Sequence, residues 1–226
     1  MLRFLPFLLA ILYAVAMYKL SSRRMMRELD QKSTQLVDPA LRTEIKKLAR
    51  AMEVEDIPVF LYHIEPVNGL AAPDGRVFIT KGFYDRFRQG QVSAAELASV
   101  IAHEIGHVAL GHSKRRMIDF GGQNAVRMAL GAILSRFIPM FGMAVANFVA
   151  NLLMAKLSRS DEFEADAYAT ALLEKAKIGA QAQISMFEKL DELTGITNRP
   201  PAWLLSHPDT ETRIDAIRSN LIKWQS

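Results

Sequence analysis

The feature that most restricts the fold of this 226-residue chain is a strongly apolar helix that also carries two histidines and a glutamate. A capping box marks its start, with Ser93 at the cap and Glu96 three residues later, and we expect it to end near Gly111. Apolar side chains occupy nearly every side of this helix: Val100, Ile101, Ala102, Ile105, Val108, Ala109 and Leu110. A helix of this composition is buried. The polar residues of its His-Glu-Ile-Gly-His motif, residues 103–107, therefore need partners inside the protein.

The spacing of this motif is suited to binding a metal ion. His103 and His107 lie one helical turn apart on the same face, so both imidazoles can reach one ion. Zn²⁺ binds imidazole nitrogen at about 2.0–2.1 Å and lowers the pKa of a water that it holds to about 7. Glu104 can accept a proton from that water and pass it to a leaving amine. We predict one zinc ion per chain, with His103 and His107 as ligands and Glu104 as the general base.

A catalytic zinc site takes a third protein ligand and leaves a fourth position open. His112 lies about 140° round the helix from the second histidine, so we interpret it as a structural or surface residue. The acidic segment 158–166 offers carboxylates instead. Glu162 and Asp166 are four residues apart, so one can bind the metal while the other accepts the ring N–H of a ligand histidine. On spacing alone Glu164 is also a candidate ligand, and an ordinary solvated acidic helix is a third interpretation.

The rest of the chain predicts an α+β fold that is mainly helical, with a small sheet near its start. Asp38 followed by Pro39 is typical of a helix start, with a cap and then a proline in the first turn. Short β-rich runs follow a proline and a Pro-Asp-Gly turn. We expect strands at residues 59–64 and 77–80, and further helices at 161–175, at 181–193 and from 208 onward.

Three segments together resemble a known family: the HEIGH motif, the segment SRSDEFEAD at residues 158–166, and the late pair His207-Pro208. They are similar to HtpX-type and CAAX-prenyl-protease-type membrane-associated zinc metalloendopeptidases, of which BepA is a relative. The resemblance runs from about residue 37 to the end and includes residues 68–72 and 76–82, which are similar to the family's edge-strand segment. It implies a gluzincin-like domain in which a second helix supplies Glu162 as third ligand and Asp166 as the carboxylate that supports a ligand.

His207 has two interpretations. It can cap the helix that Pro208 begins. The resemblance implies instead that it lies at the metal, either as an oxyanion donor or as a fourth ligand that keeps the enzyme latent.

The N-terminal segment is apolar, and residues 4–18 carry no charge. As a helix they span about 22 Å, and snorkelling of Arg3 and Lys19 extends the usable length to about twenty residues. We therefore predict a single membrane anchor at residues 1–20. The alternative is a cleaved signal peptide, with the small residues at 14–16 as its cleavage site.

Positive charge is concentrated directly behind this segment. Residues 19–50 hold nine basic and four acidic residues, a net +5, whereas the whole chain has a formal net charge of +4. This position suits an anionic membrane surface better than a nucleic-acid groove, so we predict a membrane partner and no nucleic-acid partner. The positive-inside rule favours the cytoplasmic face for the body of the protein, and the signal-peptide interpretation places it on the periplasmic or exported side.

We divide the chain into an anchor at residues 1–20, a basic juxtamembrane linker at 21–36 and a zinc metallopeptidase domain at 37–226. Within that domain residues 117–157 separate the two metal-binding motifs. Residues 137–154 are uncharged, which is borderline for a membrane span, and they include Pro139 and Gly142. We interpret this region as a helical lid over the cleft or as a hairpin that dips into the membrane.

The predicted function is zinc-dependent hydrolysis of peptide bonds in membrane-associated or misfolded polypeptides. We expect the substrate to bind in extended form beside the strand at residues 77–80. A latent protease-like chaperone or assembly factor is the alternative, although a pure binding protein has no need of Glu104 beside the metal. A structural zinc domain is disfavoured, because it uses four closed ligands and usually cysteine, which this chain lacks.

Overall fold

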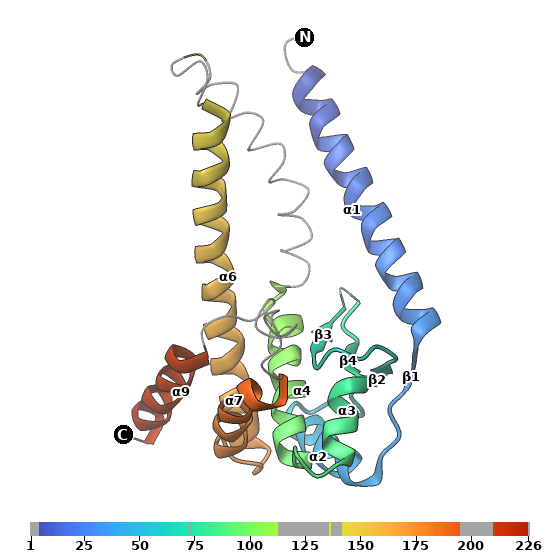
Figure 1. The fold of residues 1–226 in the computed structure, drawn as a ribbon, viewed down its shortest axis with the longest axis vertical. Coiled ribbons are helices and arrows are strands. Elements are labelled where there is room, and N and C mark those ends of the chain that lie inside the picture. The colour runs from blue at the N-terminus through green and yellow to red at the C-terminus, as the bar shows by residue number, and fades with distance from the viewer. Residues whose placement is uncertain (1–4, 73, 113–135, 137–141, 195–209, 226) are drawn as a thin grey trace. The chain divides into compact units, whose positions relative to one another are not determined.

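The computed structural model describes residues 5–72, 74–112, 136, 142–194 and 210–225 (Figure 1). It is mainly helical with a small sheet, as the sequence predicts for an α+β fold. In chain order the elements are α1 (Leu5–Lys32), β1 (Ser33–Gln35), α2 (Pro39–Ala51), β2 (Val59–Tyr62), β3 (Gly69–Ala71), β4 (Val77–Thr80), α3 (Lys81–Arg88), α4 (Ala94–Ala109), α6 (Gly142–Lys175), α7 (Gln181–Thr194) and α9 (Thr210–Gln225).

The chain divides into two compact units, Met1–Glu28 with Gly111–Ser160 and Leu29–Leu110 with Asp161–Ser226. The second unit contains the sheet, whose strand order is β1-β2-β4-β3. β2 and β4 are parallel, with Val59 opposite Val77, and the two outer strands run antiparallel to their neighbours. All four residues of β4 are buried, as expected for a strand that is paired on both sides.

The sheet order corrects the predicted substrate-binding strand. We expected a peptide to bind beside residues 77–80, but β4 already pairs with β2 on one side and with β3 on the other. Among the described residues, β1 and β3 are the edges of the sheet. The prediction was wrong because the number of neighbours of a strand is a non-local property that its own sequence does not carry.

Helix α4 lies at the centre of this unit and packs against α2, α7, β3 and β4. Figure 1 shows α7 and the sheet on opposite sides of it. The predicted capping box is present, since Ser93 Oγ accepts from the Glu96 N–H and Glu96 accepts from the Ser93 N–H. The Glu96 carboxylate also accepts from Ser185 and Lys189 on α7. One side chain therefore caps α4 and holds α7 against it.

Most of residues 21–36, the predicted basic juxtamembrane linker, are in regular structure, because α1 continues to Lys32 and β1 then pairs with β2. Helix α3 was not predicted. It begins directly after β4, where the Thr80 side chain caps it, and Gly82 lies so close to the chain that an added Cβ would meet the Glu65 carbonyl oxygen at 1.7 Å. The division into an anchor, a linker and a catalytic domain stays a prediction.

The first unit contains most of α1 and the first half of α6. No helix in the described part of the chain has the combination of length and apolar composition that a membrane crossing requires. Most of the segment interpreted as a lid or membrane-dipping hairpin, residues 117–157, lies outside the described residues, and residues 142–157 form the start of α6.

Candidate metal centre

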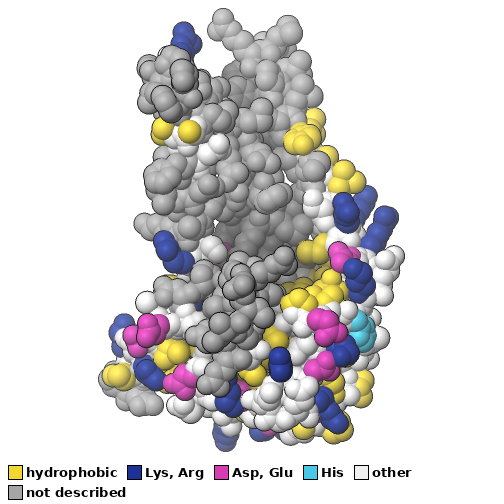
Figure 2. All heavy atoms as spheres, viewed as in Figure 1, with side chains coloured by type: hydrophobic (Ala, Val, Ile, Leu, Met, Phe, Trp, Pro, Cys, Tyr) yellow, Lys and Arg dark blue, Asp and Glu magenta, His cyan; other side chains and the backbone are white. Residues whose placement is uncertain are grey.

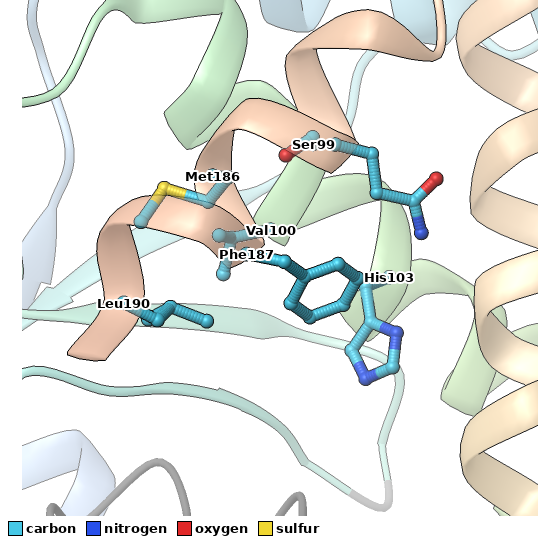
Figure 3. Close-up of a pocket in the computed structure, with 7 residues that line it drawn as sticks. Ser99, Val100, His103, Met186, Phe187 and Leu190 are labelled. Carbon is cyan, nitrogen blue, oxygen red and sulfur yellow. The ribbon is translucent and has the colours of Figure 1, made fainter. Parts of the chain in front are cut away.

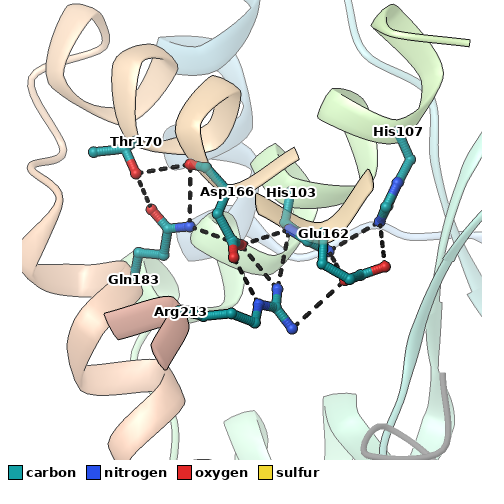
Figure 4. Close-up of polar contacts among 7 residues, drawn as sticks. All are labelled: His103, His107, Glu162, Asp166, Thr170, Gln183 and Arg213. Carbon is teal, nitrogen blue, oxygen red and sulfur yellow. Dashed lines mark hydrogen bonds and ion pairs between the residues drawn. The ribbon is translucent and has the colours of Figure 1, made fainter. Parts of the chain in front are cut away.

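Two histidines of α4 present their ring nitrogens to each other (Figure 4). His103 and His107 are 2% and 3% exposed, and their Nε2 atoms are 3.1 Å apart. Because the two residues are one helical turn apart, the backbone of α4 places both rings on the side that α6 covers. A pair of imidazole nitrogens this close, buried away from water, is suited to sharing one cation.

Glu162 of α6 completes a triangle with the two histidines. Its Oε2 lies 3.3 Å from His103 Nε2, and its Oε1 lies 3.4 Å from His107 Nε2. A tetrahedral ion with ligand bonds of about 2.0–2.1 Å has ligand atoms about 3.3–3.4 Å apart. The two sides that end at Glu162 match these separations, and the side between the two Nε2 atoms is slightly shorter at 3.1 Å. The three residues form a group that could hold a metal.

Glu162 can reach the histidines because α4 and α6 cross closely. Gly106 faces the backbone of Ala165, and this contact leaves no space for a side chain. The glycine inside the HEIGH motif thus lets α6 approach within reach of both imidazoles.

Asp166 lies one turn beyond Glu162 on α6 and fixes the orientation of one imidazole. Its Oδ1 is 2.9 Å from His103 Nδ1, so it accepts the ring N–H there and leaves the Nε2 lone pair for a cation. Burial alone would lower the pKa of His103, but the hydrogen bond and charge of Asp166 outweigh burial and raise that pKa to about 9. A proton and a cation therefore compete for this ring.

Asp166 is itself held by two further side chains. Arg213 of α9 donates from Nε to Oδ2 at 2.6 Å and from Nη2 to Oδ1 at 2.8 Å, and Gln183 of α7 donates to Oδ1 at 3.3 Å. Burial raises the pKa of Asp166, but the charge and hydrogen bonds of Arg213 lower it by more, so the net shift is downward. Asp166 is therefore an ionised carboxylate that accepts hydrogen bonds from side chains of α4, α7 and α9.

The other predicted site residues lie in different surroundings. Glu104 is buried on α4, and a Cβ on Gly69 of β3 would be 3.4 Å from Glu104 Cγ and Oε1. Glu164 is exposed, on the side of α6 away from Glu162. His112 is buried, and it is not part of the three-residue group that could bind a metal. His207 lies outside the described residues.

Reasoning from the sequence assigned no role at the site to Arg213, Gln183 or Thr170, although Arg213 follows the His207-Pro208 pair of the family pattern. Arg213 is only 1% exposed and Thr170 is fully buried, where it donates to Gln183 (Figure 4). One feature of the sequence could have identified Arg213 as unusual. It directly precedes Ile214 and is four residues before Ile217, so a positive charge stands on the apolar stripe of its helix.

A small pocket opens beside His103 between α4 and α7 (Figure 3). Its lining is mostly apolar and comprises Ser99, Val100, His103, Gln183, Met186, Phe187 and Leu190. This side of the imidazole therefore faces a mostly apolar surface.

Comparison with known proteins gives a consistent result. The model of a family described as Peptidase family M48 matches residues 35–221. The Metalloprotease LoiP of Escherichia coli (strain K12) is 29% identical over 91% of this chain and 81% of that protein. The Metalloprotease YcaL of the same organism is 30% identical over 78% and 68%. A putative beta-barrel assembly-enhancing protease of Vibrio cholerae serotype O1 is 31% identical over 85% of this chain and 42% of its own length.

Proposed function

The chain belongs to peptidase family M48 and is a metalloprotease, and on this basis we propose that it is a zinc-dependent endopeptidase. Its family membership confirms the resemblance inferred from the sequence motifs. The main support for zinc is the triangle formed by His103, His107 and Glu162, whose sides of 3.1–3.4 Å are close to those of a tetrahedral ion with two nitrogen ligands and one oxygen ligand. These three residues would hold the ion.

Zinc, when bound, supplies Lewis acidity that polarises a substrate carbonyl and acidifies water. Glu104 acts as the general base. Its carboxylate takes a proton from the attacking water as the new C–O bond forms, and returns that proton to the leaving nitrogen as the C–N bond breaks. Its place supports this role, because Glu104 directly follows His103 in the chain and its carboxylate lies beside β3.

We propose that the substrate binds along β3. In the antiparallel pair of β3 and β4, the Thr80 N–H donates to the Asn68 carbonyl and the Ala72 N–H donates to the Arg76 carbonyl. Because such bonds alternate along a strand, the N–H and C=O groups of Gly69 and Ala71 point away from β4. A peptide added at this edge would therefore hydrogen-bond to those two residues and pass beside Glu104.

The test combines metal analysis with hydrolysis of an unfolded protein such as casein. We expect one zinc per chain in the wild type. Glu104→Gln should keep the zinc and lose at least about 10²-fold in hydrolysis, the usual scale for loss of a general base. Glu164→Gln is the matched control, because it makes the same change at an exposed carboxylate. Full hydrolysis by a zinc-loaded Glu104→Gln variant would contradict the mechanism and favour another base.

We propose that residues 1–20 anchor the protein in a membrane and that its substrates are membrane-associated or misfolded polypeptides. The uncharged run at 4–18 and the basic flank at 19–50 support the anchor, and the charge flank favours the cytoplasmic face. The name of the Vibrio cholerae relative refers to assembly of β-barrels, which fits a membrane-associated substrate. Among the described residues on the face shown in Figure 2, Lys and Arg are interspersed with Asp and Glu, a pattern unlike the single-sign field of a nucleic-acid site.

Carbonate extraction of membranes tests the anchor. The full chain should stay in the membrane, and a chain that starts at Asp38 should be released. A mature protein that begins at Met17 would show instead that the segment is a cleaved signal peptide and that the body lies on the exported side.

His207 is proposed to act at the metal on the strength of the family resemblance alone. The substitution His207→Ala distinguishes its two possible roles. Activity should rise if His207 is a fourth ligand that keeps the enzyme latent, and it should fall by about 10²-fold if His207 donates to the oxyanion. Unchanged activity would leave only a capping role at the helix that follows.

A further inference from the structure

Arg213 is a buried positive charge in a place where an apolar residue would serve packing better. It is 1% exposed and lies on the side of α9 that carries the buried residues Ile214 and Ile217. Removing a guanidinium from water is costly, and a buried ion pair is often no more stabilising than well-packed apolar residues of the same volume. Packing alone therefore does not account for an arginine at this position.

The contacts of Arg213 point to the metal centre. Two of its three nitrogens are bound to Asp166 in a fork, Nε to Oδ2 at 2.6 Å and Nη2 to Oδ1 at 2.8 Å. The third, Nη1, makes no hydrogen bond within the described part of the chain, and it lies 3.5 Å from Glu162 Oε2. The guanidinium carbon lies 4.5 Å from the centroid of the Phe187 ring, which holds the plane of the fork.

Asp166 and Glu162 have different parts at the metal centre: Asp166 orients the ligand His103, and Glu162 is itself a proposed ligand. Asp166 Oδ1 receives both Arg213 Nη2 and the His103 ring N–H, so the position of the fork determines where the imidazole can point. Glu162 Oε2 faces His103 Nε2 and Arg213 Nη1 together. One planar group thus touches both carboxylates, which are four residues apart on α6.

We propose that Arg213 is a positioning residue of the metal centre: from α9 it sets the orientation of Asp166 and Glu162, and through them the geometry with which His103 and Glu162 bind the metal. This inference rests on the proposed metal site. It assigns to the C-terminal helix a part in the metalloprotease site that neither the HEIGH motif nor the acidic segment contains.

The shape of the side chain matters as well as its charge. A guanidinium has three nitrogens in one plane and can serve two carboxylates at once. A lysine keeps the positive charge but offers a single nitrogen, so it cannot reproduce the two-nitrogen fork on Asp166 together with the third nitrogen near Glu162. Arg213→Lys therefore separates the geometric role from simple charge balance.

The first measurement is metal affinity, taken by competition with a chelator of known zinc affinity on the full chain. Arg213→Lys should bind zinc about 10–100-fold more weakly than the wild type, the usual effect of losing a group that supports a ligand. Arg218→Lys is the matched control, because Arg218 lies on the same helix, is 54% exposed and pairs with Glu188 at 3.3 Å. The control should bind zinc like the wild type.

A second measurement separates positioning from a merely structural role. Cobalt(II) bound in place of zinc gives a visible spectrum that reports ligand geometry, and this readout does not depend on hydrolysis. We expect an altered spectrum for Arg213→Lys and an unchanged one for Arg218→Lys. If Arg213→Lys lowers the melting temperature of the metal-free protein but keeps wild-type zinc affinity and the wild-type cobalt spectrum, Arg213 is structural only and the proposal is overturned.

A double-mutant cycle with Asp166→Asn covers the case in which Arg213→Lys folds poorly. Because Arg213 acts partly through Asp166, the losses of zinc affinity in the two single variants should not add in the double variant. If Asp166→Asn alone leaves zinc affinity unchanged, Arg213 does not act on the metal site through Asp166, and the proposal is overturned. Failure of the proposed function would be recognised by a different result: the wild-type protein would bind no zinc or hydrolyse no peptide.

Discussion

Gly106 of α4 faces Ala165 of α6 so closely that a Cβ at Gly106 would lie 2.9 Å from the Ala165 carbonyl oxygen and 3.1 Å from its Cα. The nearest atoms belong to the backbone, so they cannot turn aside as the end of a side chain could. The two helices are therefore held at a separation that only glycine permits, and that separation brings Glu162 to the histidines.

Gly106→Ala tests this contact, because the contact and helix propensity predict opposite changes in folding stability. By helix propensity alone, alanine should stabilise α4 by about 0.8–1.0 kcal/mol. We expect the opposite, a loss of about 1–3 kcal/mol from overpacking together with weaker zinc binding, because α6 must move away. Denaturant unfolding and chelator competition measure the two effects. Stabilisation with unchanged zinc affinity would show that the helices can separate freely.

The acidic segment of α6 predicts a graded series. Glu162→Ala should abolish tight zinc binding, because it removes one of three protein ligands. Asp166→Asn should weaken zinc binding by about 10–100-fold, the scale for a group that orients a ligand. Glu164→Ala should have almost no effect, because Glu164 is exposed while the other two are 1% exposed. The same chelator competition serves all three variants. Loss of the metal in Glu164→Ala alone would mean that the orientation of this helix is wrong.

Zinc binding should release a proton from His103. In the metal-free protein its pKa is raised to about 9 by Asp166 against the opposing effect of burial, so at pH 8 the ring is mostly protonated. The apparent zinc affinity should therefore rise by up to about tenfold per pH unit below pH 9 and level off above it. The raised pKa also stabilises the metal-free fold below pH 6.5, and this contribution is lost as the pH rises through 9.

Calorimetric titration in buffers of different ionisation enthalpy counts the released protons. At pH 8 the wild type should release nearly one proton more than Asp166→Asn, because burial lowers the pKa of His103 and Asp166 is the group that raises it most. Protons from water at the metal are common to both proteins and cancel in the difference. Equal proton release would mean that Asp166 does not hold the proton on His103.

Ala71→Pro tests β3 as the strand that receives the substrate. Proline removes one N–H and is tolerated at a sheet edge where that group points outward, as at Ala71. Losing one substrate hydrogen bond should lower kcat/KM by about 2- to 13-fold, since such a bond contributes about 0.5–1.5 kcal/mol. Zinc affinity should not change. A variant with wild-type kcat/KM would place the substrate elsewhere.

Local signals in the sequence were sufficient for part of the site. The capping box of Ser93 and Glu96 lies within one helical turn, and the cap at Asp38 was also correctly predicted. The spacing of His103 and His107 needs only a helix to bring the rings together. Spacing alone did not decide whether Glu162 or Glu164 is the ligand, and in the structure Glu162 faces the histidines.

Other features depend on contacts between distant segments and could not be predicted. β3 has three residues, and pairing with β4 forms it where its sequence, Gly-Leu-Ala, has little strand preference. Arg213 is 47 residues from Asp166, and its own helix gives only the unusual placement of a charge on an apolar stripe. Nothing within a few residues of either position records which segment it will contact.

The separation of 110 residues between His103 and Arg213 also has a consequence during synthesis. A ribosome adds about 5–20 residues per second, so the HEIGH helix leaves the translation machinery about 5–20 seconds before Arg213 does. A nascent chain in that interval carries the histidines without the guanidinium that orders their supporting carboxylates. On the proposed role of Arg213, the metal centre is therefore incomplete and binds zinc more weakly while unfolded segments of the same chain are nearby.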